Sequence, residues 1–228
     1  MRTIANFSRE GFITAAIEQP DKSIVIANAD GDIDADGANG QNGAKAAYMV
    51  DDKGSEYLAN GGMGMSHGRV VGVTSWFRSI VILNDDGEPF ITMDGVIPSK
   101  TAYKWPRPLA VDGSAYVDSE MIPYICVPPE IQNGVAGVVL GCRCSVTYKG
   151  GRPIEGMVAD IGPRSKIGEI SIAMARALGI NPDPRKGGED RPLLTYVIYP
   201  GVFSRYRGTL VPLQRKNGTY IIPADEQK

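Results

Sequence analysis

The stretch Val158-Ala-Asp-Ile-Gly-Pro-Arg-Ser-Lys-Ile-Gly-Glu169 places two carboxylates nine positions apart, directly before an amphipathic segment. Asp160 closes a run of apolar residues, which predicts that it stands at the end of a strand. Gly162-Pro163 then predicts a turn. Glu169 falls in or just before the first turn of the helix expected over 170–178. Two acids directed into one cleft are the arrangement that most glycoside hydrolases use. Spacing alone favours a structural role, with Glu169 at a helix N-terminus beside a turn aspartate.

Outward from this stretch, short β-branched runs alternate with clusters of Gly, Pro, Asn and Asp. Besides the strand that ends at Asp160, we expect strands at 23–27, 46–50, 70–74, 77–83, 88–93, 124–127, 135–148 and 194–199. Asn84-Asp-Asp-Gly87 predicts a hairpin turn. The one convincing helix, 170–178, is followed by Gly179, which stands where a left-handed cap belongs.

The remaining segments divide the chain into an arm, one domain and a tail. Residues 1–20 are expected to be mildly helical or irregular and to form an N-terminal arm, and residues 214–228 a polar tail. Residues 28–43, rich in Asp, Gly and Asn, are expected to be loop. Between the ends, residues 21–213 predict a mainly β (β-rich α+β) domain with one principal helix, most simply a barrel.

Composition narrows the function classes. The 228 residues are 43% hydrophobic and 22% charged, as in ordinary soluble proteins. A net charge of -2 without a basic cluster argues against nucleic-acid binding. The apolar run 12–17 is interrupted by Thr14 and flanked by Glu10 and Glu18, which is unlike a secretory signal, and we expect no membrane span. Three cysteines with His67 as the only histidine predict neither a disulfide framework nor a zinc site, so we expect no metal and no cofactor.

An acidic run, Asp30-Gly-Asp32-Ile-Asp34-Ala-Asp36-Gly37, is the second candidate site. It matches the opening of a calcium loop, but Gly43 stands where an EF-hand needs a bidentate Glu. No Lys or Arg lies between Lys22 and Lys45, so the segment concentrates negative charge and suits a cationic ligand or an adventitious metal. If it is extended, the four aspartates share one side. A solvated turn is the alternative.

A third candidate is the segment 116–124, where aromatic residues stand beside Asp118 and Glu120. Such a mixture suits stacking on sugars and recognition of their hydroxyl or amine groups, although aromatic residues are more often part of a core.

Taken together and in order, these segments resemble the glycoside hydrolase family 75 chitosanases. The resemblance covers roughly residues 21–202 and rests on 30–37, 57–60, 116–125, 158–163, 166–173, 178–182 and 195–201. It implies an endo-acting hydrolase of β-1,4-linked glucosamine polymers (chitosan), with inversion at the anomeric carbon, built on a six-stranded double-psi β-barrel.

For individual residues, the resemblance implies that Asp160 and Glu169 are the catalytic pair, with their acid and base roles left open. Asp34 or Asp36 is a credible third participant. Inversion predicts carboxyl groups about 6.5–9.5 Å apart. The residues expected to bind substrate are Asp30, Asp32, Asp34, Asp36, Glu120 and Lys166.

The resemblance also implies a polysaccharide as the partner and a secreted protein, although no leader is visible and a cytoplasmic or virion-associated protein is the alternative. Two other functions stay open: a related hydrolase of another glycan such as peptidoglycan, and a catalytically inactive structural or sugar-binding barrel.

Overall fold

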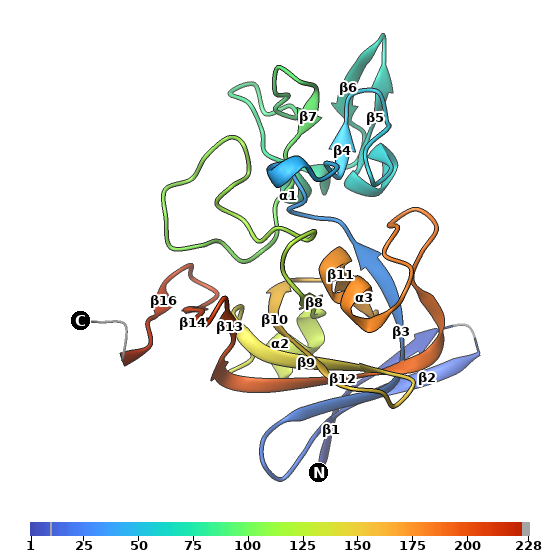
Figure 1. Cartoon of the computed structure of the whole chain (residues 1–228), viewed down its shortest axis with the longest axis vertical. Helices are drawn as coiled ribbons and strands as arrows, with labels where there is room; N and C mark the ends of the chain where they lie inside the picture. The colour runs from blue at the N-terminus through green and yellow to red at the C-terminus, as the bar shows by residue number, and fades with distance from the viewer. Residues whose placement is uncertain (10, 225–228) are drawn as a thin grey trace.

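A closed barrel of six strands forms the centre of the molecule in the computed structural model, which describes residues 1–9 and 11–224 (Figure 1). Around the barrel the strands follow the order β3 (Ile24–Asp34), β11 (Glu169–Ser171), β8 (Tyr124–Cys126), β10 (Ile154–Asp160), β9 (Cys142–Tyr148) and β12 (Glu189–Phe203). β12 pairs with β3 and closes the barrel. The pairs β3–β11 and β8–β10 are parallel and the others antiparallel, so the barrel is mixed. The expected barrel in a mainly β chain is confirmed.

Strand periodicity explains how this barrel is filled. Side chains alternate across a strand, and the buried positions recur at every second residue of β9 and β12. Cys142, Cys144 and Val146 face inward from β9, and Leu194, Tyr196 and Ile198 from β12. Each large apolar side chain buried in this way contributes about 1.5–3 kcal/mol. The predicted strands that end at Asp160 and that span 194–199 are therefore confirmed by the same pattern that predicted them.

The principal helix, α3 (Ile172–Leu178), follows β11 directly. Ser171 caps it by accepting a hydrogen bond from the Met174 N–H at 3.0 Å, and Gly179 ends it with φ 73°. Because Ser171 is the cap, Glu169 lies in β11 and not in the first helical turn. The other α-helices among the described residues, α1 (Phe77–Ile80) and α2 (Pro129–Gly134), are short.

The N-terminal segment is a β-hairpin, so the prediction of a helical or irregular arm is wrong. β1 (Arg2–Arg9) pairs with β2 (Phe12–Glu18), and β2 pairs with β3 only through Ala16–Glu18. The hairpin extends the sheet beyond β3 and buries Phe7 and Ala16. Buried residues are few in these two strands and stand among polar ones, so composition alone did not predict the hairpin.

The loop expected over 28–43 is also wrong for residues 28–34, which continue β3. The acidic part of the strand pairs in parallel with β11, with Asp32 opposite Glu169 and Asp34 opposite Ser171. Asn28 has a left-handed conformation (φ 57°), and the register against β12 shifts in this part of the strand. Asp30 and Asp32 are paired with cations from distant segments, Arg9 and Lys166, and these partners cannot be seen in the local sequence.

A smaller lobe lies above one end of the barrel in Figure 1. It contains the antiparallel pairs β4 (Tyr48–Met49) with β7 (Val96–Ile97) and β5 (Met63–Ser66) with β6 (Arg69–Gly72), and the 3-10 helices η1 (Gln41–Gly43) and η2 (Leu58–Gly61). The strand predicted at 77–83 is wrong, because Phe77–Ile80 forms α1. The turn at Asn84–Gly87 is confirmed by hydrogen bonds from Asn84 to Glu88 (2.9 Å) and from Gly87 to Asn84 (3.0 Å). The returning segment forms only a bridge, Leu83 with Pro89.

Two small hairpins end the described chain. They pair β13 (Arg205–Tyr206) with β14 (Thr209–Leu210), and β15 (Leu213–Gln214) with β16 (Tyr220–Ile221). Gln214, where the polar tail was expected to start, is buried and accepts a hydrogen bond from the Lys104 N–H at 2.8 Å. The last residues of that tail, 225–228, lie outside the described residues. Among the helices of the described chain, none has the length and apolar character needed to span a membrane.

Candidate active site

Strand pairing brings Asp160 and Glu169 to the same edge of the barrel. β8 lies between the two strands that carry them: Cys126 is the register partner of Asp160, and Ile125 is the partner of Ile170 next to Glu169. Gly162, in the turn that follows Asp160, lies against the Glu169 side chain. A Cβ atom placed on it would lie 2.7 Å from Glu169 Oε2, so the Glu169 carboxylate lies directly against the turn that follows Asp160.

The Asp160 carboxylate is anchored by the backbone. Its Oδ1 accepts hydrogen bonds from the Ala102 N–H at 3.0 Å and the Ile161 N–H at 2.7 Å. Asp160 is half-buried. Burial first, and the charge of Asp34 next, raise the pKa of Asp160 well above its usual range, although both backbone hydrogen bonds act in the opposite direction. Asp160 therefore keeps its proton to a much higher pH than an ordinary aspartate.

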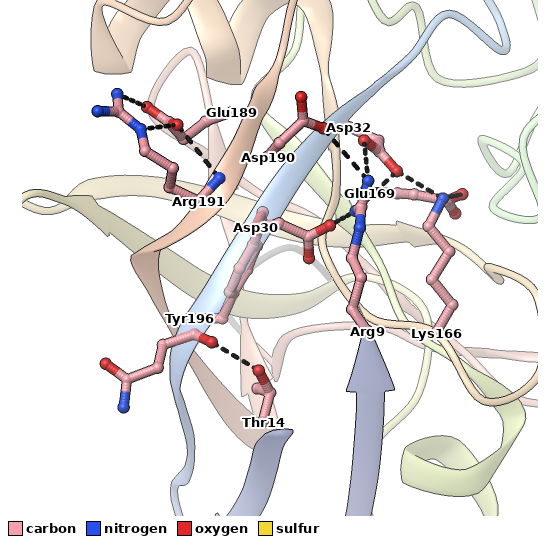
Figure 2. A network of polar contacts seen from close by, with 11 residues as sticks. Arg9, Thr14, Asp30, Asp32, Lys166, Glu169, Glu189, Asp190, Arg191 and Tyr196 are labelled. Atoms are coloured by element: carbon pink, nitrogen blue, oxygen red, sulfur yellow. Dashed lines mark hydrogen bonds and ion pairs between the residues drawn. The ribbon is translucent and has the colours of Figure 1, made fainter. Parts of the chain in front are cut away.

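Lys166 gives Glu169 a different environment. The ammonium group lies 3.1 Å from Glu169 Oε1 and 2.7 Å from Asp32 Oδ2, so it bridges the two carboxylates (Figure 2). Burial raises the pKa of Glu169; the charge of Lys166 opposes that rise without cancelling it, so the pKa is raised overall. Burial also raises the pKa of Asp32, but the hydrogen bonds and charges of Lys166 and Arg9 outweigh it and lower the pKa overall. A cation thus favours the ionised form on this side of the site.

Asp34 lies at the end of β3, close to Asp160. Its Oδ2 accepts hydrogen bonds from Cys126 Sγ at 2.8 Å and from the Tyr124 hydroxyl at 3.1 Å. One ligand-type atom each of Asp34, Cys126 and Asp160 lie within 4.8 Å of one another. Burial is the main cause that raises the pKa of Asp34. These three atoms are close enough to ligate one metal ion together, although the Cys126–Asp34 hydrogen bond already satisfies the thiol.

Asp36 completes the inner cluster. Its backbone N–H donates to Asp34 Oδ1 at 2.8 Å, and its own Oδ1 accepts from the Tyr48 hydroxyl at 3.2 Å. Burial, followed by the charges of Asp34 and Asp160, raises the pKa of Asp36 well above its usual range. Several carboxyl groups at this end of the barrel therefore share fewer negative charges than their number suggests.

The four aspartates of the acidic run, here called the acidic row (Asp30, Asp32, Asp34 and Asp36), extend from the N-terminal hairpin to the inner cluster. Arg9 of the hairpin forms ion pairs with Asp30, Asp32 and Asp190 (Figure 2). Asp30 is almost completely buried, and its backbone carbonyl accepts a hydrogen bond from the Tyr196 hydroxyl at 2.7 Å. The structure thus brings together all four aspartates, Lys166, Asp160 and Glu169 in one connected region.

Glu120 is the predicted substrate-binding residue that does not join this region. Its carboxylate pairs with Arg176 of α3 at 2.7 Å, and the same arginine donates to the Glu120 carbonyl. Sequence reasoning also missed three contributors: Arg9, Tyr48 and Cys126. Cys126 is free and buried, as are Cys142 and Cys144. The position of Cys126 in the apolar run after Tyr124 gave no signal of its contact with Asp34.

Comparisons with known proteins add no identification to this geometry: no protein-family model matches the chain, and no curated protein matches it.

Proposed function

We propose that the protein is an endo-acting glycoside hydrolase that cleaves β-1,4-linked glucosamine polymers with inversion. The observation that carries the proposal is the position of Asp160 and Glu169 on either side of one turn, with Asp34 as the charged neighbour of Asp160 and Lys166 as that of Glu169. Glycoside hydrolysis by inversion needs one protonated carboxyl group and one ionised carboxylate at the same bond. Pairs of acids whose surroundings separate their pKa values are the typical source of such a division.

We assign the acid role to Asp160. Its Oδ1 is held by two backbone N–H groups, which leaves Oδ2 to carry the proton. Burial and the neighbouring Asp34 raise its pKa well above its usual range, so we assign Asp160 as the member of the pair that holds the proton. In the reaction, Oδ2 donates its proton to the glycosidic oxygen as the bond to the anomeric carbon breaks. The Asp160 carboxylate that remains then takes up a proton from solvent.

We assign the base role to Glu169: burial raises its pKa, but the neighbouring Lys166 opposes that rise and favours the ionised form, whereas no cation does so for Asp160 in the ion pairs of the described residues. The carboxylate accepts a proton from a water molecule whose oxygen attacks the anomeric carbon from the face opposite the leaving group, and it releases that proton to solvent before the next turnover. Lys166 also holds the carboxylate in place through Oε1, so it acts as a positioning residue. Oε2 lies beside Gly162 and is the oxygen that faces the Asp160 turn.

The half-buried Asp32 of the acidic row, whose pKa is lowered, supports glucosamine as the sugar, because an ionised carboxylate attracts a protonated amine. Neutral chitin or cellulose would gain nothing from this charge. Peptidoglycan hydrolysis and glycan binding without cleavage are the competing functions, and they predict different products.

Product analysis on a panel of chitosan, chitin, cellulose and peptidoglycan tests the proposal. We expect reducing ends from chitosan alone, with the α-anomer formed first from the β-linked substrate, as seen by proton NMR. Release from peptidoglycan without release from chitosan would assign the site to another glycan. Calorimetric binding of chitosan with no product at any pH would assign it to a binding domain.

A further inference from the structure

A pocket of about 350 Å³ lies between the tip of the N-terminal hairpin, the acidic part of β3 and the segment before β11. Asp30 and Asp32 line it on the β3 side, and Lys166 on the side of the candidate base. Its apolar lining comes from Phe7, Phe12 and Ile167, and its hydroxyl groups from Ser8, Thr14 and Ser165. An acidic side, apolar surface and hydroxyl groups in a space of this size are suited to one small polar ring with a positive charge.

The hairpin tip is attached to the barrel differently from the hairpin base. At the base, β2 pairs with β3 along Ala16–Glu18. Toward the tip that pairing stops, and side chains make the connection: the Thr14 hydroxyl donates to the Asn28 carbonyl at 2.6 Å, and Phe7 is buried. Arg9 supplies the charged connection. The tip is therefore the part of the hairpin whose position depends on side-chain contacts.

The pocket already holds a positively charged side chain, that of Arg9. Its guanidinium pairs with Asp30, lies 3.2 Å from Asp32 Oδ2 through Nη1, and lies 3.3 Å from Asp190 Oδ1 through Nη2 (Figure 2). With Lys166 and Glu169 included, four carboxylates surround two cationic side chains. The excess negative charge leaves the pocket attractive to a further cation, and a cation that displaced Arg9 would meet the same acids.

We propose that this pocket binds one protonated amino-sugar unit of the substrate chain, and that Arg9 competes with that unit for Asp30 and Asp32. The inference rests on the proposed function for the identity of the sugar. Lys166, which lines the pocket and pairs with Glu169, places the pocket beside the candidate base. The hairpin then sets substrate affinity: each time the amino sugar enters, Arg9 must leave its acids.

Glucosamine monomer is the probe, because it has the charged amine but no glycosidic bond, so binding does not depend on hydrolysis. Titration calorimetry at a pH where the amine is protonated measures its affinity. We expect Arg9→Gln to bind glucosamine about tenfold more tightly than the wild type, since a competitor that occupies the site lowers apparent affinity by the unoccupied fraction. Asp32→Asn should abolish detectable binding.

Arg2→Gln is the matched control, because Arg2 is in the same hairpin but pairs with Glu18 at the base, at 2.9 Å. It should bind glucosamine as the wild type does. Asp190→Asn is a second variant that weakens the hold on Arg9 without altering the pocket lining, since Asp190 is 91% exposed. Asp190→Asn should also tighten glucosamine binding, by a smaller factor than Arg9→Gln. It keeps the proposal testable if Arg9→Gln reduces stability.

The subsite is rejected if N-acetylglucosamine, which lacks the charge, binds as tightly as glucosamine. It is also rejected if neither Arg9→Gln nor Asp190→Asn tightens binding in protein that unfolds cooperatively. A wild type that cleaves chitosan while both variants bind glucosamine unchanged rejects the subsite and leaves the proposed function in place. Tightening without any chitosan cleavage supports the subsite and rejects the hydrolase.

Discussion

The two halves of the acidic row have the same residue type at alternate positions of β3 and just beyond its end, yet the pKa of Asp32 in one half shifts in the opposite direction to those of Asp34 and Asp36 in the other. Asp30 and Asp32 pair with Arg9, and Asp32 also pairs with Lys166, which lowers the pKa of Asp32 overall. Asp34 and Asp36 form no ion pair within residues 1–9 and 11–224, and their pKa values are raised, chiefly by burial. Nearby cations, and not the aspartates themselves, decide where protons are held.

The same contrast separates the catalytic candidates. Burial raises the pKa of both groups, but Lys166 opposes the rise at Glu169, as it does at Asp32, whereas the charge of Asp34 adds to the rise at Asp160. One boundary between the halves thus runs between the base and the acid. Substitutions at this boundary should have the largest effects on activity, and substitutions away from it the smallest.

Asp160→Asn and Glu169→Gln remove the acid and the base and should each lower kcat on chitosan by about 10³-fold or more, because general acid and base groups contribute about 10²–10⁴-fold. Reducing-end assays on folded variants measure this. Glu155→Gln is the control, since Glu155 is an exposed carboxylate on β10, the strand of Asp160. Full activity in both catalytic variants would remove the basis of the assignment.

Lys166→Gln should lower kcat/KM by about 10²-fold at neutral pH. Without the ammonium group the pKa of Glu169 rises further, so a smaller fraction of the base is ionised. Activity should recover as the pH is raised, and the acidic limb of the pH–rate profile should move to higher pH. Lys166→Arg should restore much of the rate. A uniform loss at every pH would mean that Lys166 serves only to hold structure.

Gly162→Ala should reduce kcat by about tenfold to 10²-fold with little loss of stability, since small misplacements of catalytic groups have effects of this size. The new Cβ would lie 2.7 Å from Glu169 Oε2 and displace the base, while the backbone at this residue does not need a positive φ. Gly151→Ala, in the exposed turn before β10, is the control. Unchanged kinetics in Gly162→Ala would place the working position of Glu169 elsewhere.

Much of the barrel was predictable because the order of apolar and polar residues within a strand indicates which of its side chains are buried. Alternation identified the strand that ends at Asp160 and the closing strand β12, and Gly179 identified the end of α3. The acidic half of β3 could not be predicted, because the residues that pair with it, Arg9, Lys166 and Glu169, are far away in sequence. Without knowledge of those partners, a run of aspartates and glycines predicts a loop.

The site was predictable to a similar degree. The two acids and the acidic row were identified from motif order, and the structure brings them together. The division of roles was not, since it depends on which acid meets a lysine and which meets another aspartate. Tyr48 and Cys126, each a single polar contact from an apolar strand, left no pattern in the sequence.

Asp36→Asn should stabilise the fold above the acidic range by about 1–3 kcal/mol, the usual size of the penalty for a poorly solvated polar group. A carboxyl group with a raised folded-state pKa contributes its stability below its ordinary pKa of about 4 and loses it as the pH rises through the raised pKa. Asparagine does not ionise, and its Oδ1 can still accept from Tyr48. Urea unfolding at several pH values measures the difference, which should vanish near pH 4.

The smallest effect is expected at the exposed ion pair of Arg143 and Glu155, where the atoms are 2.6 Å apart. Arg143→Gln should change the free energy of unfolding by less than about 1 kcal/mol, because exposed pairs are screened by solvent. Chitosan turnover should be unaffected. A large change here would mean that ion pairs act on this barrel irrespective of burial, and the contrast between the two halves of the row would lose its physical basis.

Carbon-13 NMR titration of the aspartate and glutamate carboxyl groups, assigned with Asp160→Asn and Glu169→Gln, tests the central claim most directly. We predict that Asp160 is still protonated at a pH where Glu169 is already ionised, and that Lys166→Gln narrows the interval between the two transitions. Ionisation of Asp160 before Glu169, or of both together at the pH of ordinary carboxyl groups, would contradict the division of acid and base roles.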